Sequence, residues 1–502
     1  MRKELHQILL FGTGRKKLSD DLLQALEQQG FDLSNPPEQL LLDGLATYEL
    51  FRKAAIRLEE HPESKSIEVP DLSNERRCSP RSARHLQKIL NGDFAKALDE
   101  FIHYLRVGKY SLPPEVLPEL LDQAVADETF WESIKHAIGP RGEWLLQQHP
   151  EWKTLGQSLN EEDWELGTLK QRVRLLKKLR HQKPEDVIPL LEAVWSFEGS
   201  KEKKELLSTL AFGLSANDEI FLEKCLDDRH KDTRLAAAKL LARLPASNLR
   251  KRIKEYLEEW LVVQNNILQL QLPEQINKSI KRDGIQEGPK RMIKQEKKEL
   301  WLSQAVGLIP LEYWEERLDM KPANALQWLT RNHSLFLNAL VDAILLHKNK
   351  EWATALAEYW LKNNNPQQWK GSKNKQILFL LPNKAFNSIC TRYFKSHPYP
   401  LHQEHFIAHL LSLGKHRWED ELTRLFVRNM QEWIENVSSY YFEDQPYLGI
   451  IKVAAYHVNP HLFSTLQNGW YYKSRAMIRW EKRIEQFLNT LIFRKEMIQY
   501  LR

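Results

Sequence analysis

The densest group of potential metal ligands lies in the last quarter of the chain. Its members are His402, Glu404, His405, His409 and His416. His405 and His409 are four residues apart, a spacing that would let both imidazoles on a helix reach one metal ion. The spacing fits neither zinc-protease pattern, because Phe406 stands at the glutamate position of HExxH and Leu401 at the first histidine position of HxxEH. We interpret the histidines as surface and packing residues. His402, His405 and His409 remain weak metal candidates, and we expect no metal or other cofactor.

Two glycine-containing segments resemble ligand-binding loops only superficially. A phosphate-binding P-loop requires GxxxxGK[ST], whereas Gly12-Thr13-Gly14-Arg15-Lys16-Lys17 is followed by Leu18. We expect a solvated basic turn there, with Arg15 kept as a structural or interaction candidate. Gly139-Pro140-Arg141-Gly142 is interpreted as a second turn. We expect Arg141, Trp144 and Trp152 to pack the end of the N-terminal unit, and a guanidinium over an indole would add a cation–π contact.

Basic residues recur in two stretches of the sequence with aromatic residues nearby. They are Arg172, Arg174, Lys177, Lys178 and Arg180 in the first stretch, and Arg243, Arg250, Lys251, Arg252 and Lys254 in the second. On a helical-repeat surface such residues can follow a phosphate backbone, as in some DNA glycosylases. Each group also lies among Asp and Glu, and the isoelectric point of about 8.9 is below the usual value for a nucleic-acid-binding domain. Solvated helix faces are therefore the favoured interpretation, and a nucleic-acid groove is the alternative.

Composition indicates the kind of fold that must position these residues. The 502 residues include 79 Leu against 15 Val, with only 19 Gly. This bias favours helices and disfavours β-sandwiches, barrels and Rossmann-type enzymes. The formal net charge is only +6, so composition alone indicates no strongly anionic partner.

The sequence predicts a soluble protein of a reducing compartment. The apolar run from Ile8 to Phe11 is too short for a secretory signal, and Leu335 to Leu346 is too short to cross a bilayer. Cys78, Cys225 and Cys390 are far apart and form no CxxC motif. We expect a cytoplasmic location and no membrane partner.

Hydrophobic periodicity predicts an all-α protein in which an N-terminal helical unit precedes a HEAT-like α-solenoid of antiparallel helix pairs. The expected parts are an N-terminal helical domain (1–158), HEAT-like repeats (159–270), a charged, exposed connection (271–299) and C-terminal helical repeats with a capping helix (300–502). The helices expected in the first repeats are 165–181, 184–196, 201–214, 218–226, 232–244 and 246–263. Short connections between such helices favour antiparallel packing.

The clearest repeat unit runs from Asp227 to Pro245. Its apolar stripe consists of Ala237, Leu240, Leu241 and Leu244, at helical spacing. Asp232 is placed to cap the helix and Pro245 to end it. We expect Arg234 to be structural, bridging to the turn of Asp227 and Asp228 or to the next repeat.

Several motifs in this order resemble the bacterial DUF5691 family. They are Leu10–Arg15, Leu112–Asp122, Gly139–Leu145 with Pro150–Trp152, Asp227–Pro245, Arg282–Ile285, Trp301–Leu302 with Pro310 and Trp314, and Arg494–Met497. The resemblance implies a helical-repeat protein with no assigned reaction. Genes of that family tend to lie beside those of MoxR-type AAA+ ATPases, von Willebrand A-domain proteins and SWIM zinc-finger proteins, which suggests a scaffold or adaptor.

The leading hypothesis is a non-enzymatic scaffold or adaptor that binds other proteins on a helical-repeat surface. Its proposed partners include a MoxR-type AAA+ ATPase or a von Willebrand A-domain protein. The alternatives are a nucleic-acid-binding, DNA glycosylase-like protein and, more weakly, a metal hydrolase at His402 to His409. We expect no catalytic residues. The structural or interaction candidates are Arg15, Arg141, Trp144, Trp152, Asp228 and Arg234.

Overall fold

The structure is a computed structural model that describes most of the chain. The described residues are 8–9, 13, 17–54, 76–156, 164–397, 401–402, 404–436, 446–470 and 478–501. The chain divides into two compact units, Met1–Pro70 and Asp71–Arg502, called unit 1 and unit 2 below. Each unit is described by itself.

Unit 1 contains two described helices around a small core. They are α2 (Asp20–Gln28) and α3 (Pro37–Ala54). The Ser19 hydroxyl accepts a hydrogen bond from Leu22 N at 3.3 Å and so caps the start of α2. Leu22, Leu26, Leu40 and Leu41 form the core together with Ile8.

Unit 2 begins with short helices. These are α4 (Pro80–Leu90), η1 (Ala95–Ala97), α5 (Leu98–Val107), η2 (Pro114–Val116), α6 (Leu117–Ala126), α7 (Glu128–Ile134), α8 (Gly139–Gln148) and α9 (Pro150–Gly156). Prolines at the first turns of several of them suit positions that need no backbone donor.

The elements from residue 169 to the hairpin are α11 (Leu169–Gln182), η3 (Pro184–Asp186), α12 (Val187–Val194), α13 (Ser200–Thr209), η4 (Ala216–Asp218), α14 (Glu219–Cys225), α15 (Lys231–Arg243), α16 (Asn248–Trp260), β1 (Leu261–Gln264) and β2 (Ile267–Leu270). Next come α17 (Lys278–Arg282), α18 (Lys294–Leu308), α19 (Glu312–Leu318), α20 (Pro322–Asn332), α21 (Leu335–His347), α22 (Lys350–Asn363), α23 (Pro366–Trp369) and α24 (Ser372–Leu380). The last are α25 (Asn383–Ser396), α26 (Phe406–Ser412), α27 (Asp420–Asn436), α28 (Pro446–His457), η5 (Pro460–Leu462), α29 (Phe463–Leu466) and α30 (Ile478–Leu501).

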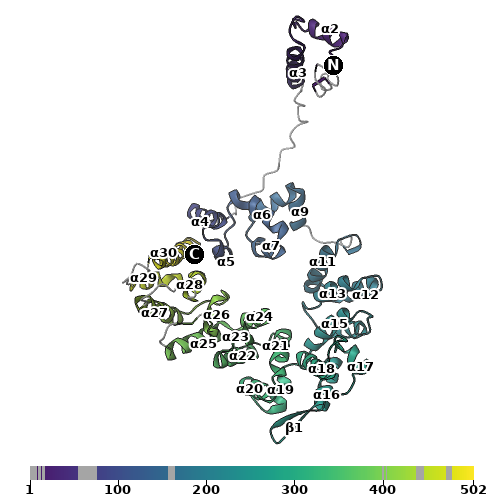
Figure 1. Ribbon diagram of the computed structural model, residues 1–502, viewed down its shortest axis with the longest axis vertical. Helices are drawn as coiled ribbons and strands as arrows, with labels where there is room; N and C mark the ends of the chain where they lie inside the picture. Colours follow the sequence, from purple (N-terminus) through teal and green to yellow (C-terminus); the bar gives the residue numbers. More distant parts are fainter. Residues whose placement is uncertain are drawn as a thin grey trace. The chain divides into compact units, whose positions relative to one another are not determined.

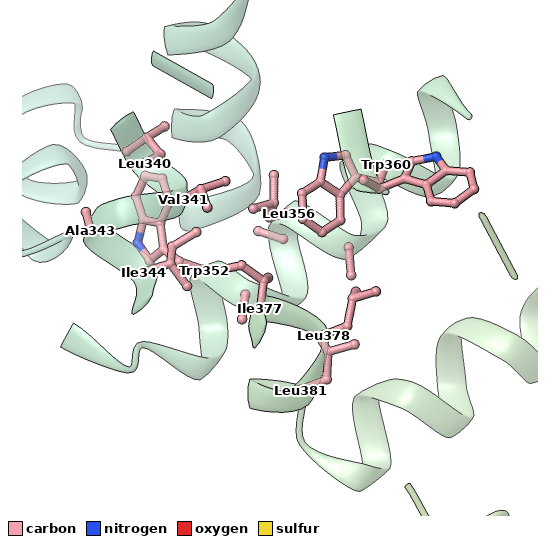
Figure 2. Packing of buried hydrophobic residues seen from close by; sticks show 14 of the residues in the cluster. Leu340, Val341, Ala343, Ile344, Trp352, Leu356, Trp360, Ile377, Leu378 and Leu381 are labelled. Carbon is pink, nitrogen blue, oxygen red and sulfur yellow. The ribbon is translucent and has the colours of Figure 1, made fainter. Parts of the chain in front are cut away.

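Helices from α11 onward contact helices two positions further along the chain. Contacts join α11 to α13, α13 to α15, α20 to α22, α25 to α27, α26 to α28 and α28 to α30. One continuous hydrophobic core runs through this region from Trp164 to Leu491. Figure 2 shows part of this core, including Leu340 of α21, Leu356 of α22 and Ile377 of α24. The expectation of a predominantly helical protein is confirmed.

Helix α30 belongs to two cores at once. Its first half contributes Ile484, Phe487 and Leu491 to the long core. Its second half contributes Phe493, Met497, Ile498 and Leu501 to a second core, formed otherwise by α4 to α9. The expected capping helix therefore packs on the long core and also returns to the first helices of unit 2 (Figure 1).

One arginine connects α30 to the neighbouring helices by hydrogen bonds. Arg494 donates two hydrogen bonds to the Glu100 carboxylate, at 2.6 and 2.8 Å. It also donates to the carbonyl oxygens of Ala455 and Val458 in and just after α28. The guanidinium thus joins α30 to both α5 and α28, although Glu100 lies 394 positions earlier in the sequence.

The hairpin corrects the expectation of a helix over 246–263. Helix α16 ends at Trp260, and β1 pairs with β2 in antiparallel register, Leu261 with Leu270 and Gln264 with Ile267. Asn265 and Asn266 both have positive φ, 50° and 62°, as a tight two-residue hairpin turn requires. The two adjacent asparagines were the signal for this turn.

Two further local expectations also need correction. Asp232 does not cap α15, because the helix begins at Lys231 with His230 at the N-cap, and Asp232 lies in the first turn. The segment 271–299 is not exposed throughout, since it contains α17 and buries Ile276, Ile280 and Ile285. In contrast, Ala237, Leu240 and Leu241 of α15 are buried, and so is Leu244, which directly follows the helix, so the predicted apolar stripe is confirmed.

Among the residues that the structure describes, none of the helices has the length and apolar character needed to span a membrane.

Candidate functional site

The histidines of the predicted cluster pack against different aromatic residues. His405 precedes α26, and its ring lies against that of Tyr393, with centroids 4.6 Å apart. His409 lies against Trp369 instead, at 4.9 Å, while His402 is exposed. Burial, together with the nearby His397 and His402, lowers the pKa of His405 to about 4. Within the described ranges, no group of three or more His, Cys, Asp or Glu side chains is arranged to hold a metal ion.

Most basic residues of α11 are occupied by partners within the chain. Arg180 is buried and donates to both carboxylate oxygens of Asp218, at 2.9 and 2.7 Å. Arg174 pairs with Glu128 at 2.9 Å, and Arg172 pairs with Glu198 at 2.7 Å. The remaining members, Lys177 and Lys178, line an 820 Å³ cleft with Trp131 and Phe212 among its other lining residues.

The second basic group is used in the same way. Arg243 and Arg250 donate to the backbone carbonyls of Ala211 and Ala242, respectively, and Arg252 pairs with two carboxylates. Carboxylates therefore neutralise Arg172, Arg174, Arg180 and Arg252, whereas backbone carbonyls leave the positive charges of Arg243 and Arg250 uncompensated.

The next candidates come from the N-terminal part of the sequence. Trp152 is buried, and its indole nitrogen donates to Asp122 at 2.8 Å, which fixes α9 against α6. Arg141 and Trp144 are half-buried on α8. Arg15 lies outside the described residues.

The last two candidates, Asp228 and Arg234, are brought together at the start of α15. Arg234 donates to the carbonyl oxygens of Asp228 and Arg229, at 2.7 and 3.1 Å. The Asp228 carboxylate accepts a 2.6 Å hydrogen bond from Lys203 and a 2.8 Å bond from the His230 backbone. Burial opposes ionisation of Asp228, but these hydrogen bonds outweigh it and lower its pKa.

A network of ion pairs, here called the clamp, adjoins this turn. It consists of Glu223, Asp227, Arg252, Arg282 and Asp283. Asp283 is fully buried and accepts from the Arg252 guanidinium at 2.8 to 3.0 Å. Arg252 also reaches Glu223, and Arg282 joins Glu223 to Asp227. Bidentate arginine–carboxylate pairs impose geometry as well as attraction.

Tyr256 completes the clamp. Its hydroxyl donates to the second Asp283 carboxylate oxygen at 2.8 Å. Burial, reinforced by Asp283, raises the pKa of Tyr256 to about 12, so the hydroxyl keeps its proton at neutral pH. The clamp thereby fixes residues 282 and 283 against α14 and α16.

The loop after the clamp, Gly284 to Pro289, is held at several points. Gly284 has φ +90°, and a Cβ there would lie 2.7 Å from the Cβ of Ala238. Only glycine allows this close approach to α15 in that backbone conformation. Gln304 accepts from the backbone N–H of Gln286 at 2.9 Å and donates to its carbonyl at 3.1 Å. Trp301 donates to the carbonyl of Glu287 at 3.3 Å.

This loop forms one wall of a pocket of about 580 Å³. Lys231 and Arg234 of α15 and Lys281 of α17 also line this pocket. Glu287, the one carboxylate of the lining, pairs with Lys281 at 2.9 Å. The lining has three cations and one carboxylate, so the pocket is suited to an anionic group. The clamp holds the loop in place and so fixes the shape of the pocket. This pocket is the candidate functional site.

Sequence reasoning identified Arg234, Asp228 and the Arg282–Ile285 motif but did not connect them. It missed Lys231, Lys281 and Tyr256 as members of one region. The available signal was Arg282-Asp283-Gly284, two opposite charges followed by a glycine, in a segment otherwise interpreted as an exposed connection.

Comparison with known proteins assigns the chain to a family but gives that family no function. The chain belongs to the family of unknown function DUF5691, whose model matches residues 4–501. No curated protein and no solved structure matches the sequence.

Proposed function

We propose that this protein is a non-enzymatic interaction scaffold that holds an acidic segment of a partner protein in the pocket between Gly284–Pro289 and α15. The observation that carries the proposal is the clamp, which fixes the loop in front of Lys231, Arg234 and Lys281. A binding surface that is rigid before association loses less conformational entropy on binding.

We further infer that the helices from α11 onward form a HEAT-like solenoid. The contacts between alternate helices, such as α11 with α13 and α13 with α15, support this inference. In such an architecture each repeat is fixed by its neighbours, and the stacked helices present an extended surface for other proteins. The pocket would then be one defined point on that surface.

Charge complementarity selects the kind of partner. Arg234 uses one guanidinium nitrogen, Nη1, for both backbone carbonyls, and these neutral acceptors leave its positive charge uncompensated. Lys231 is exposed at the start of the helix. Aspartate or glutamate side chains of a partner could pair with both, and charged contacts of this kind raise association rates and specificity.

A direct test measures binding of a fluorescein-labelled peptide with several Asp and Glu residues by fluorescence anisotropy. We expect saturable binding to the full chain and at least tenfold weaker binding to Lys231→Glu. The matched control is Lys239→Glu, which makes the same charge change at an exposed position of the same helix but outside the pocket. Equal losses in both variants would attribute binding to net charge and refute the proposed site.

Cellular partners can be tested with the same variants. The family resemblance suggests a MoxR-type AAA+ ATPase or a von Willebrand A-domain protein as the first candidates. Co-purification with one of them that is lost in Lys231→Glu and kept in Lys239→Glu would support the proposal.

Nucleic-acid binding remains the alternative function because Lys177 and Lys178 line the 820 Å³ cleft beside Trp131 and Phe212. A salt-dependent mobility shift of DNA or RNA that is lost on replacing both lysines by Glu would favour it. No shift at low salt would remove it.

A further inference from the structure

A different cleft, here called the seam cleft, lies in unit 2 where α30 meets α28 and the turn between α4 and α5. Its volume is about 620 Å³. The lining comes from residues 92–96, from 451–456 in α28 and from 483–490 in α30. The cleft therefore exists only because the last helix returns to the first ones (Figure 1). Its volume is in the range of small-molecule sites.

Positive charge gathers in the seam cleft from three separate elements. Lys96 comes from η1, Lys452 from α28 and Arg483 from α30, against the single lining carboxylate of Asp93. Within the described residues no ion pair joins any of these three cations to an acidic side chain. The Arg483 guanidinium instead donates to the neutral amide oxygen of Gln486 at 3.1 Å. Like charges brought together repel, and a bound anion would relieve that repulsion.

His457 lies close enough to one cleft cation, Lys96, for its pKa to respond to it. Burial is the main cause that lowers its pKa to about 4, and Arg494, His416 and Lys96 lower it further, while Glu100 opposes them. The imidazole is therefore neutral at physiological pH and leaves the charge of the cleft to the lysines and Arg483.

The floor of the cleft offers apolar and hydrogen-bonding surface beside these cations. Phe94 is held in place by stacking on Phe493, with ring centroids 3.9 Å apart. Tyr456 is half-buried and also lines the cleft. Gln486 and Asn489 present exposed amides, which both donate and accept hydrogen bonds. Phosphate-binding cations beside aromatic rings and amides match a ligand that has both phosphates and a planar base.

We propose that the seam cleft binds a nucleoside phosphate, with its phosphates at Lys96, Lys452 and Arg483 and its base near Phe94 and Tyr456. Because the ligand would contact all three elements, it would hold α30 against the first helices of unit 2. This site is independent of the proposed scaffold pocket, so either can fail without the other.

The test is isothermal titration of the full chain with ADP in the presence of EDTA. We expect saturable binding of about one ADP per chain. Arg483→Glu and Lys452→Glu should each weaken it at least tenfold. Lys482→Glu is the matched control, because Lys482 is exposed on the same helix but does not line the cleft. An absence of saturable ADP binding, or an equal loss with Lys482→Glu, would overturn the proposal.

Two further probes separate the parts of the ligand. Adenosine and inorganic pyrophosphate should each bind at least tenfold more weakly than ADP. Pyrophosphate binding as tight as that of ADP would refute the role of the aromatic floor. Hydrogen exchange of the unmodified protein provides a readout that needs no variant. ADP should protect residues 92–96 and the 483–490 part of α30, and protection confined to other segments would refute the location.

Discussion

Replacing Gly284 by alanine tests whether the close approach of the loop to α15 is required. Two costs follow from the structure. Alanine at φ +90° is strained, by about 1–2 kcal/mol for a left-handed backbone conformation. The new Cβ would also lie 2.7 Å from the Cβ of Ala238, far inside normal contact, and overpacking of this kind costs about 1–3 kcal/mol. We expect a total loss of about 2–5 kcal/mol in the free energy of unfolding.

A second glycine allows the backbone strain to be measured without the packing clash. Gly213 also has positive φ, +59°, but a Cβ there would meet only the Arg180 carbonyl oxygen at an ordinary 3.5 Å. Gly213→Ala should therefore show the backbone cost alone, about 1–2 kcal/mol. Adding Ala238→Gly to Gly284→Ala removes the clashing methyl group and should recover the packing part, less about 1 kcal/mol for glycine within a helix.

The assay is urea unfolding followed by circular dichroism, with hydrogen exchange of residues 283–289 as the local readout. Gly284→Ala should lower the transition midpoint more than Gly213→Ala and should accelerate exchange in the loop. It should also weaken acidic-peptide binding, which Gly213→Ala should leave unchanged. Equal destabilisation by the two substitutions, with no recovery in the double variant, would refute the close contact.

Three other outcomes are expected. Arg494→Ala removes the partner of Glu100 and should lower the free energy of unfolding by about 3–5 kcal/mol. It should also increase hydrogen exchange in α4 and α5. Arg428→Ala, in an exposed ion pair, should change the free energy of unfolding by less than about 1 kcal/mol. The free energy of unfolding should fall as the pH drops from about 6.5 toward 4, because the unfolded chain binds a proton at His457 while the folded imidazole, with a pKa of about 4, does not. In urea unfolding at stepped pH, His457→Gln should show a shallower fall. Leu240→Asp should bury an unpaired carboxylate and cost several kcal/mol, and an unchanged thermal midpoint would contradict the assignment of that helix face.

Local pattern was enough to predict much of the helical structure. The stripe of Ala237, Leu240, Leu241 and Leu244 is buried as expected, because helical periodicity is a property of a few consecutive turns. Arg234 reaches the Asp228 turn, six residues away, which is one of the two alternatives expected from the sequence. The hairpin was not predicted because the apolar residues Leu261 to Val263 favour a continuation of α16. The turn signal of Asn265 and Asn266 is only two residues long.

The candidate sites depend on partners that are distant in sequence. Asp283 meets Arg252 31 positions earlier, and Glu100 meets Arg494 394 positions later. Many carboxylates in the chain could pair with each arginine, and no local rule selects among them. The sequence by itself determined that the chain forms amphipathic helices, since side-chain spacing decides which face is apolar. Only the tertiary structure decided which charges are buried together and that α30 returns to α4 and α5, since these depend on the packing of whole helices against one another.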